Sequence, residues 1–266
     1  MKNRQAFCPH QHRGITLVEL LIATVIAAVL LGTLLKVYVD SKNSYFLNHI
    51  KAEIQSEARA SLRILARVVE QAGYRNLRDI RQSNDEVFKA TPDFTAGQVL
   101  RAAAVGTAGG WQLETRFQGD SDGLISDCLG FTHGDDLIVT QTVTYDPQVQ
   151  ELTCSVRCDS SVPGATLCPN RTALLSDRLR ALDLLIGLDR INNDHVIDNY
   201  QPIATLSGSE SGLLAIKVLS WFESEQNVQT QAQQHVLRTF NSTVTEVDKK
   251  LRLAFSDTFS VRSRLP

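Results

Sequence analysis

Gly14-ITLVELLIATVIAAVLLGTL-Leu35 is the stretch that decides the fold of this chain. It is close to the ~20 apolar residues that a membrane-spanning helix needs, and Glu19 is its one carboxylate. The leader before it carries Lys2, Arg4 and Arg13 and no acidic residue. Basic residues ahead of an apolar span predict a cytoplasmic N-terminus.

The position of the small residue separates this leader from an ordinary secretory signal. In a secretory signal the small-residue cleavage site follows the apolar region, whereas here Gly14 precedes it. Cleavage after Gly14 would leave the whole apolar segment in the mature protein, with a new amine on Ile15. We therefore expect residues 1–14 to be a cytoplasmic leader peptide and residues 15–38 to be a single transmembrane helix.

The run Gly14-Ile-Thr-Leu-Val-Glu19 resembles the class III signal of type IV pilins and the related pseudopilins. The resemblance implies cleavage after Gly14 by a prepilin peptidase, N-methylation of Ile15, and packing of the helix into a filament core. Ile15 departs from the family, which most often has Phe there. The family's matching glutamate attracts the amino terminus of the neighbouring subunit, which would give Glu19 a role in assembly.

Glu19 also has a simpler interpretation. A carboxylate near a helix start is favoured by the helix dipole and can reach the lipid headgroups. A carboxylate inside a membrane is nevertheless costly and usually has a partner, and a protonated amine offsets the burial of both charges. Pairing of Glu19 with the amino terminus of a neighbouring subunit is therefore the favoured interpretation, and the helix-start interpretation remains open.

The helical pattern continues far beyond the membrane segment. Apolar residues at three- and four-residue steps predict an amphipathic half of the same helix over residues 39–73, ending at a left-handed cap on Gly73. Residues 74–266 then read as a β-rich globular domain, so we expect an α+β fold: a long N-terminal helix packed on a mainly antiparallel β-sheet domain. The expected strands are Trp111–Phe117, residues 135–145, Leu152–Cys158, Leu179–Leu188, Leu213–Phe222 and residues 251–264.

Charge and cysteine content narrow the function class. A net charge of −2 supplies no basic footprint for nucleic acid. Cys8 lies in the leader, so the mature protein would keep the even set Cys128, Cys154, Cys158 and Cys168. An exported domain meets an oxidising compartment where two disulfides are expected. A four-thiolate zinc site is the alternative, although paired C-x2-C spacing is missing.

Several segments of the chain resemble, in order, the PilW family of minor pilins. They are VVEQAGYRN, DGLISDCLG, the Leu-Thr-Cys at 152–154, IGLDRINNDHVIDNY and DKKLRLAFSDTFSVRSRLP. The resemblance implies a low-abundance subunit that joins other minor pilins at or near the pilus tip and primes assembly of the major pilin. Its further partners would be the prepilin peptidase and the inner-membrane pilus assembly platform, with the C-terminal domain in the periplasm.

The resemblance also favours one of the three possible disulfide connectivities. The family-like segments around Cys128 and Cys154 are expected on neighbouring strands, or on a strand and an adjacent loop. That pairing leaves Cys158 with Cys168, which would close a short loop containing Pro163 and Gly164. Cys154 and Cys158 are about 13 Å apart on an extended strand, beyond disulfide reach.

Metal and catalytic motifs are weak. In the run from Asp189, the residues Asn192, Asp194 and Asp198 fall on calcium-ligand-like positions, but Arg190 stands at the first ligand position. An Asx-rich surface turn is the favoured alternative, so no cofactor is predicted. Asp120 and Asp122 likewise form a turn that needs no metal. The histidines show no shared metal spacing and no G-x-S-x-G occurs, so we expect no enzyme.

Two other functions stay open. The first is a minor pseudopilin at the tip of a type II secretion pseudopilus, which shares the signal and size. The second is an adhesin anchored by a pilin helix, which would need a concave surface lined with aromatic and polar groups. Two Trp and five Tyr give the adhesin little support. Support of pilus-dependent motility or adhesion by a priming minor pilin is the favoured function.

Overall fold

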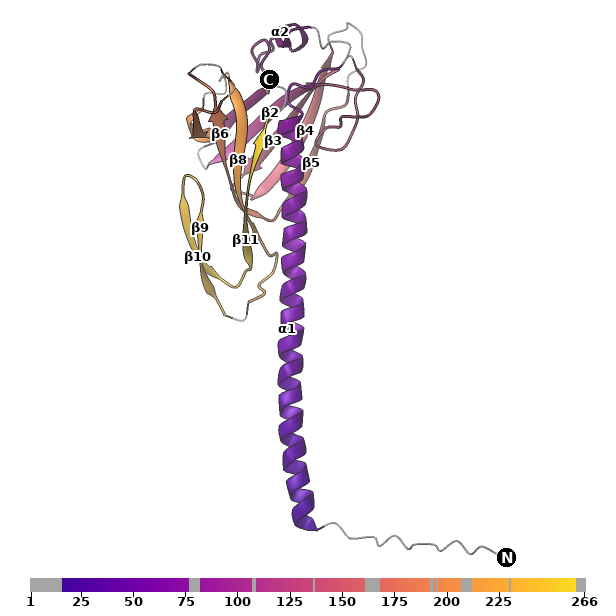
Figure 1. Cartoon of the computed structure of the whole chain (residues 1–266), viewed down its shortest axis with the longest axis vertical. Coiled ribbons are helices and arrows are strands. Elements are labelled where there is room, and N and C mark those ends of the chain that lie inside the picture. Colours follow the sequence, from indigo (N-terminus) through magenta and orange to yellow (C-terminus); the bar gives the residue numbers. More distant parts are fainter. Residues whose placement is uncertain are drawn as a thin grey trace, which may run out of the picture. The chain divides into compact units, whose positions relative to one another are not determined.

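The computed structural model describes residues 16–76, 82–106, 109–135, 137–160, 168–191, 194, 196–206, 212–229 and 231–261. Its first element is helix α1, Leu17–Glu70 (Figure 1). Contacts divide the chain into two compact units, residues 1–49 and 50–266, and α1 contributes to both.

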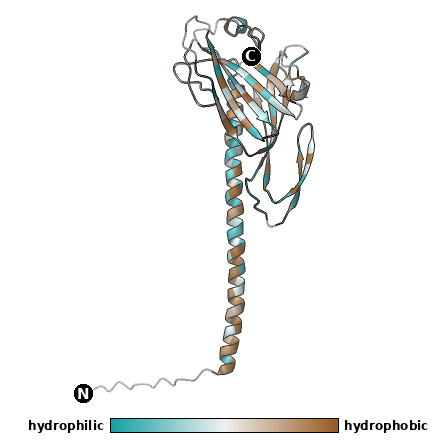
Figure 2. Ribbon diagram, turned by 180° about the vertical axis from the view of Figure 1, so that it is seen from behind, coloured by the Kyte–Doolittle hydropathy of each residue, from teal (hydrophilic) through white to brown (hydrophobic). Residues whose placement is uncertain are grey.

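The first unit contains the apolar half of α1. Its large apolar side chains from Leu17 to Val39 are all exposed, so none of the described residues covers them. Figure 2 shows hydrophobic residues around this half of the helix. Among the described residues, α1 is the one helix long and apolar enough to cross a membrane, with a mean hydropathy of 2.5 over its best window.

The second unit begins with the amphipathic half of α1. The helix ends after Glu70, and Gly73 follows at φ 77°, a left-handed conformation that glycine adopts without a Cβ clash. The Gly73 amide donates to the carbonyl of Arg116, 2.8 Å away, which joins the helix end to a strand. The buried face of this half consists of Ile54, Ala58, Ser61, Leu62, Leu65, Val68 and Val69.

A five-stranded antiparallel meander follows the helix, with its strands in chain order from β1 to β5. The short helix α2, Asn84–Val87, precedes it. Strands β1 to β4 contribute buried side chains to the core, β2 at almost every position, whereas only one position of β5 is buried. The strands are β1 (Leu100–Val105), β2 (Gly110–Gln118), β3 (Leu137–Asp146), β4 (Glu151–Ser160) and β5 (Arg171–Ser176).

A four-stranded antiparallel sheet forms the rest of the core, in the order β11-β8-β6-β7. The Trp111 indole on β2 is buried and donates to the carbonyl of Leu182 on β6 at 3.2 Å, which ties the two sheets together. The strands are β6 (Leu179–Leu188), β7 (Asn199–Pro202), β8 (Leu213–Glu223) and β11 (Arg252–Ser260), with a 3-10 turn, η1, at Ile203–Thr205.

A separate two-stranded ribbon consists of β9 (Gln233–Arg238) and β10 (Thr243–Asp248), and both ion pairs and hydrogen bonds connect it to the four-stranded sheet. Arg252 lies at its base with a side chain only 2% exposed. Its guanidinium contacts the carboxylates of Glu223 on β8 and of Glu246 and Asp248 on β10, at 2.9, 2.7 and 2.5 Å. Arg180 on β6 also pairs with Glu246.

The α+β fold class predicted from the sequence is confirmed: a long N-terminal helix is followed by antiparallel strands. All six expected strands occur. The division of these strands into two sheets and a ribbon was not part of the prediction. Each sheet has one set of apolar side chains facing a shared core, which a single layer could not bury.

Candidate functional site

The start of α1 is built as a capping box. Thr16 directly precedes the helix, and its backbone N–H and hydroxyl donate to Glu19 Oε2 at 3.0 and 3.1 Å. The Glu19 amide donates back to the Thr16 hydroxyl at 3.3 Å. Glu19 therefore satisfies donors at its own helix start, an interaction not considered in interpreting the sequence. Gly14 and Ile15 lie outside the described residues.

The surface after Glu19 is a continuous apolar helix with little polarity of its own. The hydroxyls of Thr24 and Thr33 donate to the carbonyls three residues earlier, at 2.9 and 2.8 Å. This satisfies both hydroxyls without water, as a helix in a lipid or protein environment requires. The surface is thus suited to burial against lipid or against other apolar helices.

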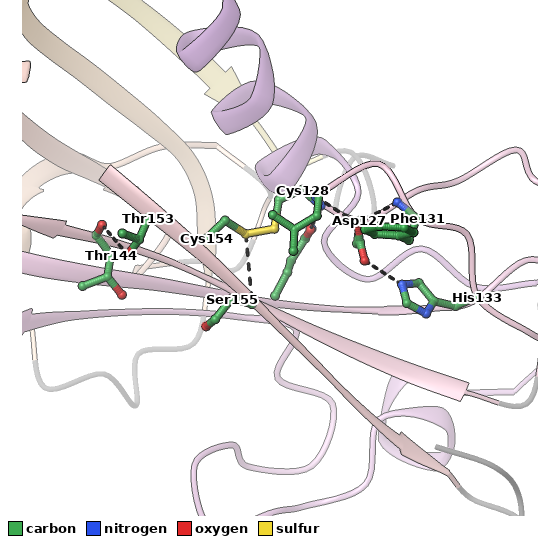
Figure 3. The surroundings of a disulfide bond; sticks show 10 residues. Asp127, Cys128, Phe131, His133, Thr144, Thr153, Cys154 and Ser155 are labelled. Atoms are coloured by element: carbon green, nitrogen blue, oxygen red, sulfur yellow. Dashed lines mark hydrogen bonds and ion pairs between the residues drawn. A yellow bond between two sulfur atoms is a disulfide. The ribbon is translucent and has the colours of Figure 1, made fainter. Parts of the chain in front are cut away.

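Two disulfides are present, joining Cys128 to Cys154 and Cys158 to Cys168, the pairs expected in the sequence analysis. Their Cα atoms are 6.5 and 5.5 Å apart. Cys154 and Cys158 both lie on β4 with their side chains in the core, and Cys128 lies in the loop between β2 and β3. The first disulfide therefore fastens that loop to the meander (Figure 3).

A buried acid and histidine organise the same loop, and the sequence analysis gave them no role. The Asp127 carboxylate accepts the amides of Leu129 and Phe131 at 2.9 Å each and contacts His133 Nε2 at 2.8 Å (Figure 3). Burial alone would raise the pKa of Asp127, but these hydrogen bonds outweigh burial and lower its pKa.

His133 connects this loop to the second disulfide. Its Nδ1 lies 3.5 Å from Cys158 Sγ, and Cys158 follows it by 25 residues. The ligand atoms of His133, Cys158 and Cys168 lie within 4.8 Å of one another, a spacing that suits a metal ion. The two sulfur atoms are bonded to each other, however, so neither is a thiolate that could bind zinc.

The acidic turn at Asp120 is occupied by protein donors. Asp120 accepts the Tyr74 hydroxyl at 2.8 Å and the Asp122 amide at 2.8 Å. Burial and the hydrogen bond to Asp120 raise the pKa of Tyr74 to about 12. The turn therefore anchors Tyr74, four residues beyond the end of α1, which is a structural role.

The Asx-rich segment lies between β6 and β7. Asp198 accepts the amides of Arg190 and Ile191 at 2.6 and 2.9 Å, and Asp194 accepts the amide of Val196 at 3.0 Å. The Asp194 contact is that of an Asx turn, whereas Asp198 closes the loop by accepting from the residues at its start. Asn192, the third calcium candidate, lies outside the described residues, so the choice between an Asx-rich turn and a calcium site stays open.

A groove of about 780 Å³ lies beside the end of α1. Its lining is basic and partly apolar, with one aromatic residue. This composition does not match the aromatic and polar surface that the adhesin alternative requires. The lining residues are Arg63, Ala66, Arg67, Glu70, Gln71, Gly73, Tyr74, Arg75, Leu124 and Ile125.

The chain was compared with family models, with curated proteins and with solved structures. Residues 9–35 match the family described as the prokaryotic N-terminal methylation motif. The comparison with curated proteins found no match. A type IV-like pilin from Thermus thermophilus is similar in structure, with a TM-score of 0.46 and 11% sequence identity over 80% of this chain and 97% of that one.

Proposed function

We propose that this chain is a minor pilin of type IV pili, which joins other minor pilins in a complex that primes pilus assembly. The observation that carries the proposal is the methylation motif over residues 9–35, placed directly on a helix whose apolar surface is uncovered. Such a helix needs lipid before assembly and neighbouring helices after it. A filament core supplies those neighbours.

The helix start explains how one carboxylate could serve both states. In the unassembled chain, Glu19 is held by Thr16 through two hydrogen bonds. After cleavage following Gly14, the amine of Ile15 becomes a charged donor in the same region. We infer that Glu19 exchanges part of its capping contacts for the amine of a neighbouring subunit, since an unpaired charge in an apolar filament core would be costly.

The globular part would act by packing in the periplasm. Its two disulfides and the ion pairs between α1 and the strands favour a rigid body. Arg178 contacts Glu53 and Glu57 of α1 at 3.0 and 3.2 Å, so the amphipathic half of the helix is fixed to the start of β6. Rigid attachment would let the domain hold a defined position at the pilus tip beside other minor pilins.

A type II secretion pseudopilin would have the same helix and processing motif. The two functions are therefore distinguished by which assembly, the pilus or the secretion system, depends on this chain. Deletion of the gene should remove surface pili while the major pilin remains at its normal level on immunoblots. Complementation with the wild-type gene should restore pili, and complementation with Gly14→Phe should not, because the peptidase loses its unobstructed site. Normal piliation with loss of a secreted type II substrate would instead establish a pseudopilin.

A further inference from the structure

The two disulfides have different surroundings. Cys154 is fully buried and Cys128 nearly so. In the described part of the chain, the Cys128 amide donates to Gln141 and the Cys154 sulfur contacts the carbonyl of Ser155, and neither of these groups is a histidine or a cation. Cys158 is also buried, at 5% exposure, but its partner Cys168 is only partly buried. The second disulfide therefore joins a partly buried residue to a buried one whose sulfur faces His133.

The group facing Cys158 is a histidine already fixed by an acid. His133 is buried, its Nε2 contacts the Asp127 carboxylate at 2.8 Å, and its Nδ1 points to Cys158 Sγ at 3.5 Å. Asp127 is in turn fixed by two backbone amides. A carboxylate on one ring nitrogen stabilises the imidazolium, and an imidazolium beside a sulfur stabilises a thiolate.

We propose that the Cys158–Cys168 disulfide is a site of thiol–disulfide exchange, entered at Cys168, with Cys158 as the leaving thiolate opposite His133. The arrangement of acid, histidine and sulfur is the one that activates cysteine nucleophiles, and here it would act on the leaving sulfur. A leaving thiol that is more acidic departs faster.

The exchange balances without another oxidant or reductant. An external thiolate attacks Cys168 Sγ, a new S–S bond forms between them, and the Cys158–Cys168 bond breaks with its electron pair on Cys158 Sγ. The product is a mixed disulfide on Cys168 and a thiolate that His133 stabilises. A second external thiol, or the second thiol of a dithiol, can then release Cys168 as a thiol.

The other disulfide is a control within the same molecule. Full-length protein in detergent micelles would be exposed to reduced glutathione, and free thiols would be alkylated at intervals and located by mass spectrometry. We expect Cys158–Cys168 to open at least about tenfold faster than Cys128–Cys154, with the glutathione adduct on Cys168. An adduct on Cys158, or equal opening rates, would overturn the proposal, and this measurement needs no variant.

Greater accessibility alone could make the Cys158–Cys168 disulfide open faster. A variant of His133 therefore tests whether the histidine contributes to the rate. His133→Gln keeps a side chain that can hydrogen-bond Asp127 but cannot carry a charge, and it should slow opening of Cys158–Cys168 by about tenfold. His235→Gln is the matched control, since His235 lies 3.8 Å from Asp248 on the β9–β10 ribbon. An unchanged rate in His133→Gln, with the Cys128–Cys154 rate and unfolding temperature as in wild type, would refute the role of His133.

Discussion

Replacing Arg252 by alanine should destabilise the globular unit by about 3 kcal/mol. The Arg252 side chain is 2% exposed and contacts Glu223 and Asp248, which are 9% and 29% exposed, together with Glu246 at 20%. Removing one partner of a buried ion pair typically costs about 3–5 kcal/mol because a charge is left uncompensated. The lower end applies here, since Lys250 still pairs with Glu223 and Arg180 with Glu246.

Thermal unfolding of the full-length protein in detergent micelles measures this effect. For a domain of this size, each kcal/mol shifts the unfolding temperature by about 2–4 °C, so a fall of about 6–12 °C is expected. Arg157→Ala is the matched control. Arg157 pairs with Asp93 at 2.9 Å, but both side chains are more than 40% exposed, and such pairs contribute less than about 1 kcal/mol. Equal shifts in the two variants would refute the reasoning.

The same network predicts the direction of the pH dependence. The hydrogen bond from Arg180 lowers the pKa of Glu246, and hydrogen bonds led by the one from Arg252 lower the pKa of Asp248 despite its burial. Carboxyl groups with a lowered pKa in the folded state stabilise it above their unfolded values of about 4. That stability is lost as the pH falls through the folded values. The unfolding temperature should therefore fall less between neutral and acidic pH in Arg252→Ala than in wild type.

Three further predictions concern single sites. Glu19→Ala should still insert and be processed but should fail to support piliation; unchanged pilus counts would reduce Glu19 to its capping role with Thr16. Millimolar calcium should leave the unfolding temperature unchanged, because backbone amides already hold one carboxylate oxygen of Asp194 and one of Asp198. A calcium-dependent rise that Asp194→Asn abolishes would contradict this. Because the pKa of Tyr74 is raised to about 12, its contribution to stability should be present below pH 10 and lost between pH 10 and about 12. Tyr74→Phe should remove this alkaline loss, and an unchanged alkaline unfolding profile would contradict it.

Local sequence patterns were sufficient to predict the helix and the strands that have one apolar face. The stripe from Ile54 to Val69 is the buried face of α1, and Gly73 has the predicted left-handed conformation. The predicted strand Leu179–Leu188 matches β6 in both of its ends. The spacing of apolar residues along the helix and the strand shows which side of each element is buried, and this spacing can be read from the local sequence.

The missed strands lack such a pattern. In the β9–β10 ribbon, Leu237 is the one fully buried residue, since ion pairs and hydrogen bonds hold the ribbon and apolar packing contributes little. β1, Leu-Arg-Ala-Ala-Ala-Val, has a composition that favours a helix, and pairing with β2 overrides that preference. Propensity alone could not have found β1, whereas the β-branched residues Thr243, Val244 and Thr245 of β10 were an indication of a strand that the prediction did not use.

The buried histidine site was missed for a different reason. His133 and Cys158 are brought together because β3 pairs with β4 in a register that places Cys158 opposite Val139, near the loop that carries Asp127. No spacing in the sequence reports that register. A useful indication was present nonetheless, since an acid and a histidine flank one turn six residues apart.

Mass measurement of the protein's N-terminus in purified pili or membranes tests the central claim most directly. A type IV minor pilin should begin at Ile15, carry a single methyl group on that amine, and retain the whole apolar helix. Gly14→Phe, expressed in the same cells, should retain the leader and begin at Met1. A wild-type chain that keeps residues 1–14, or one cut after Leu35 as a secretory signal would be, would contradict the account.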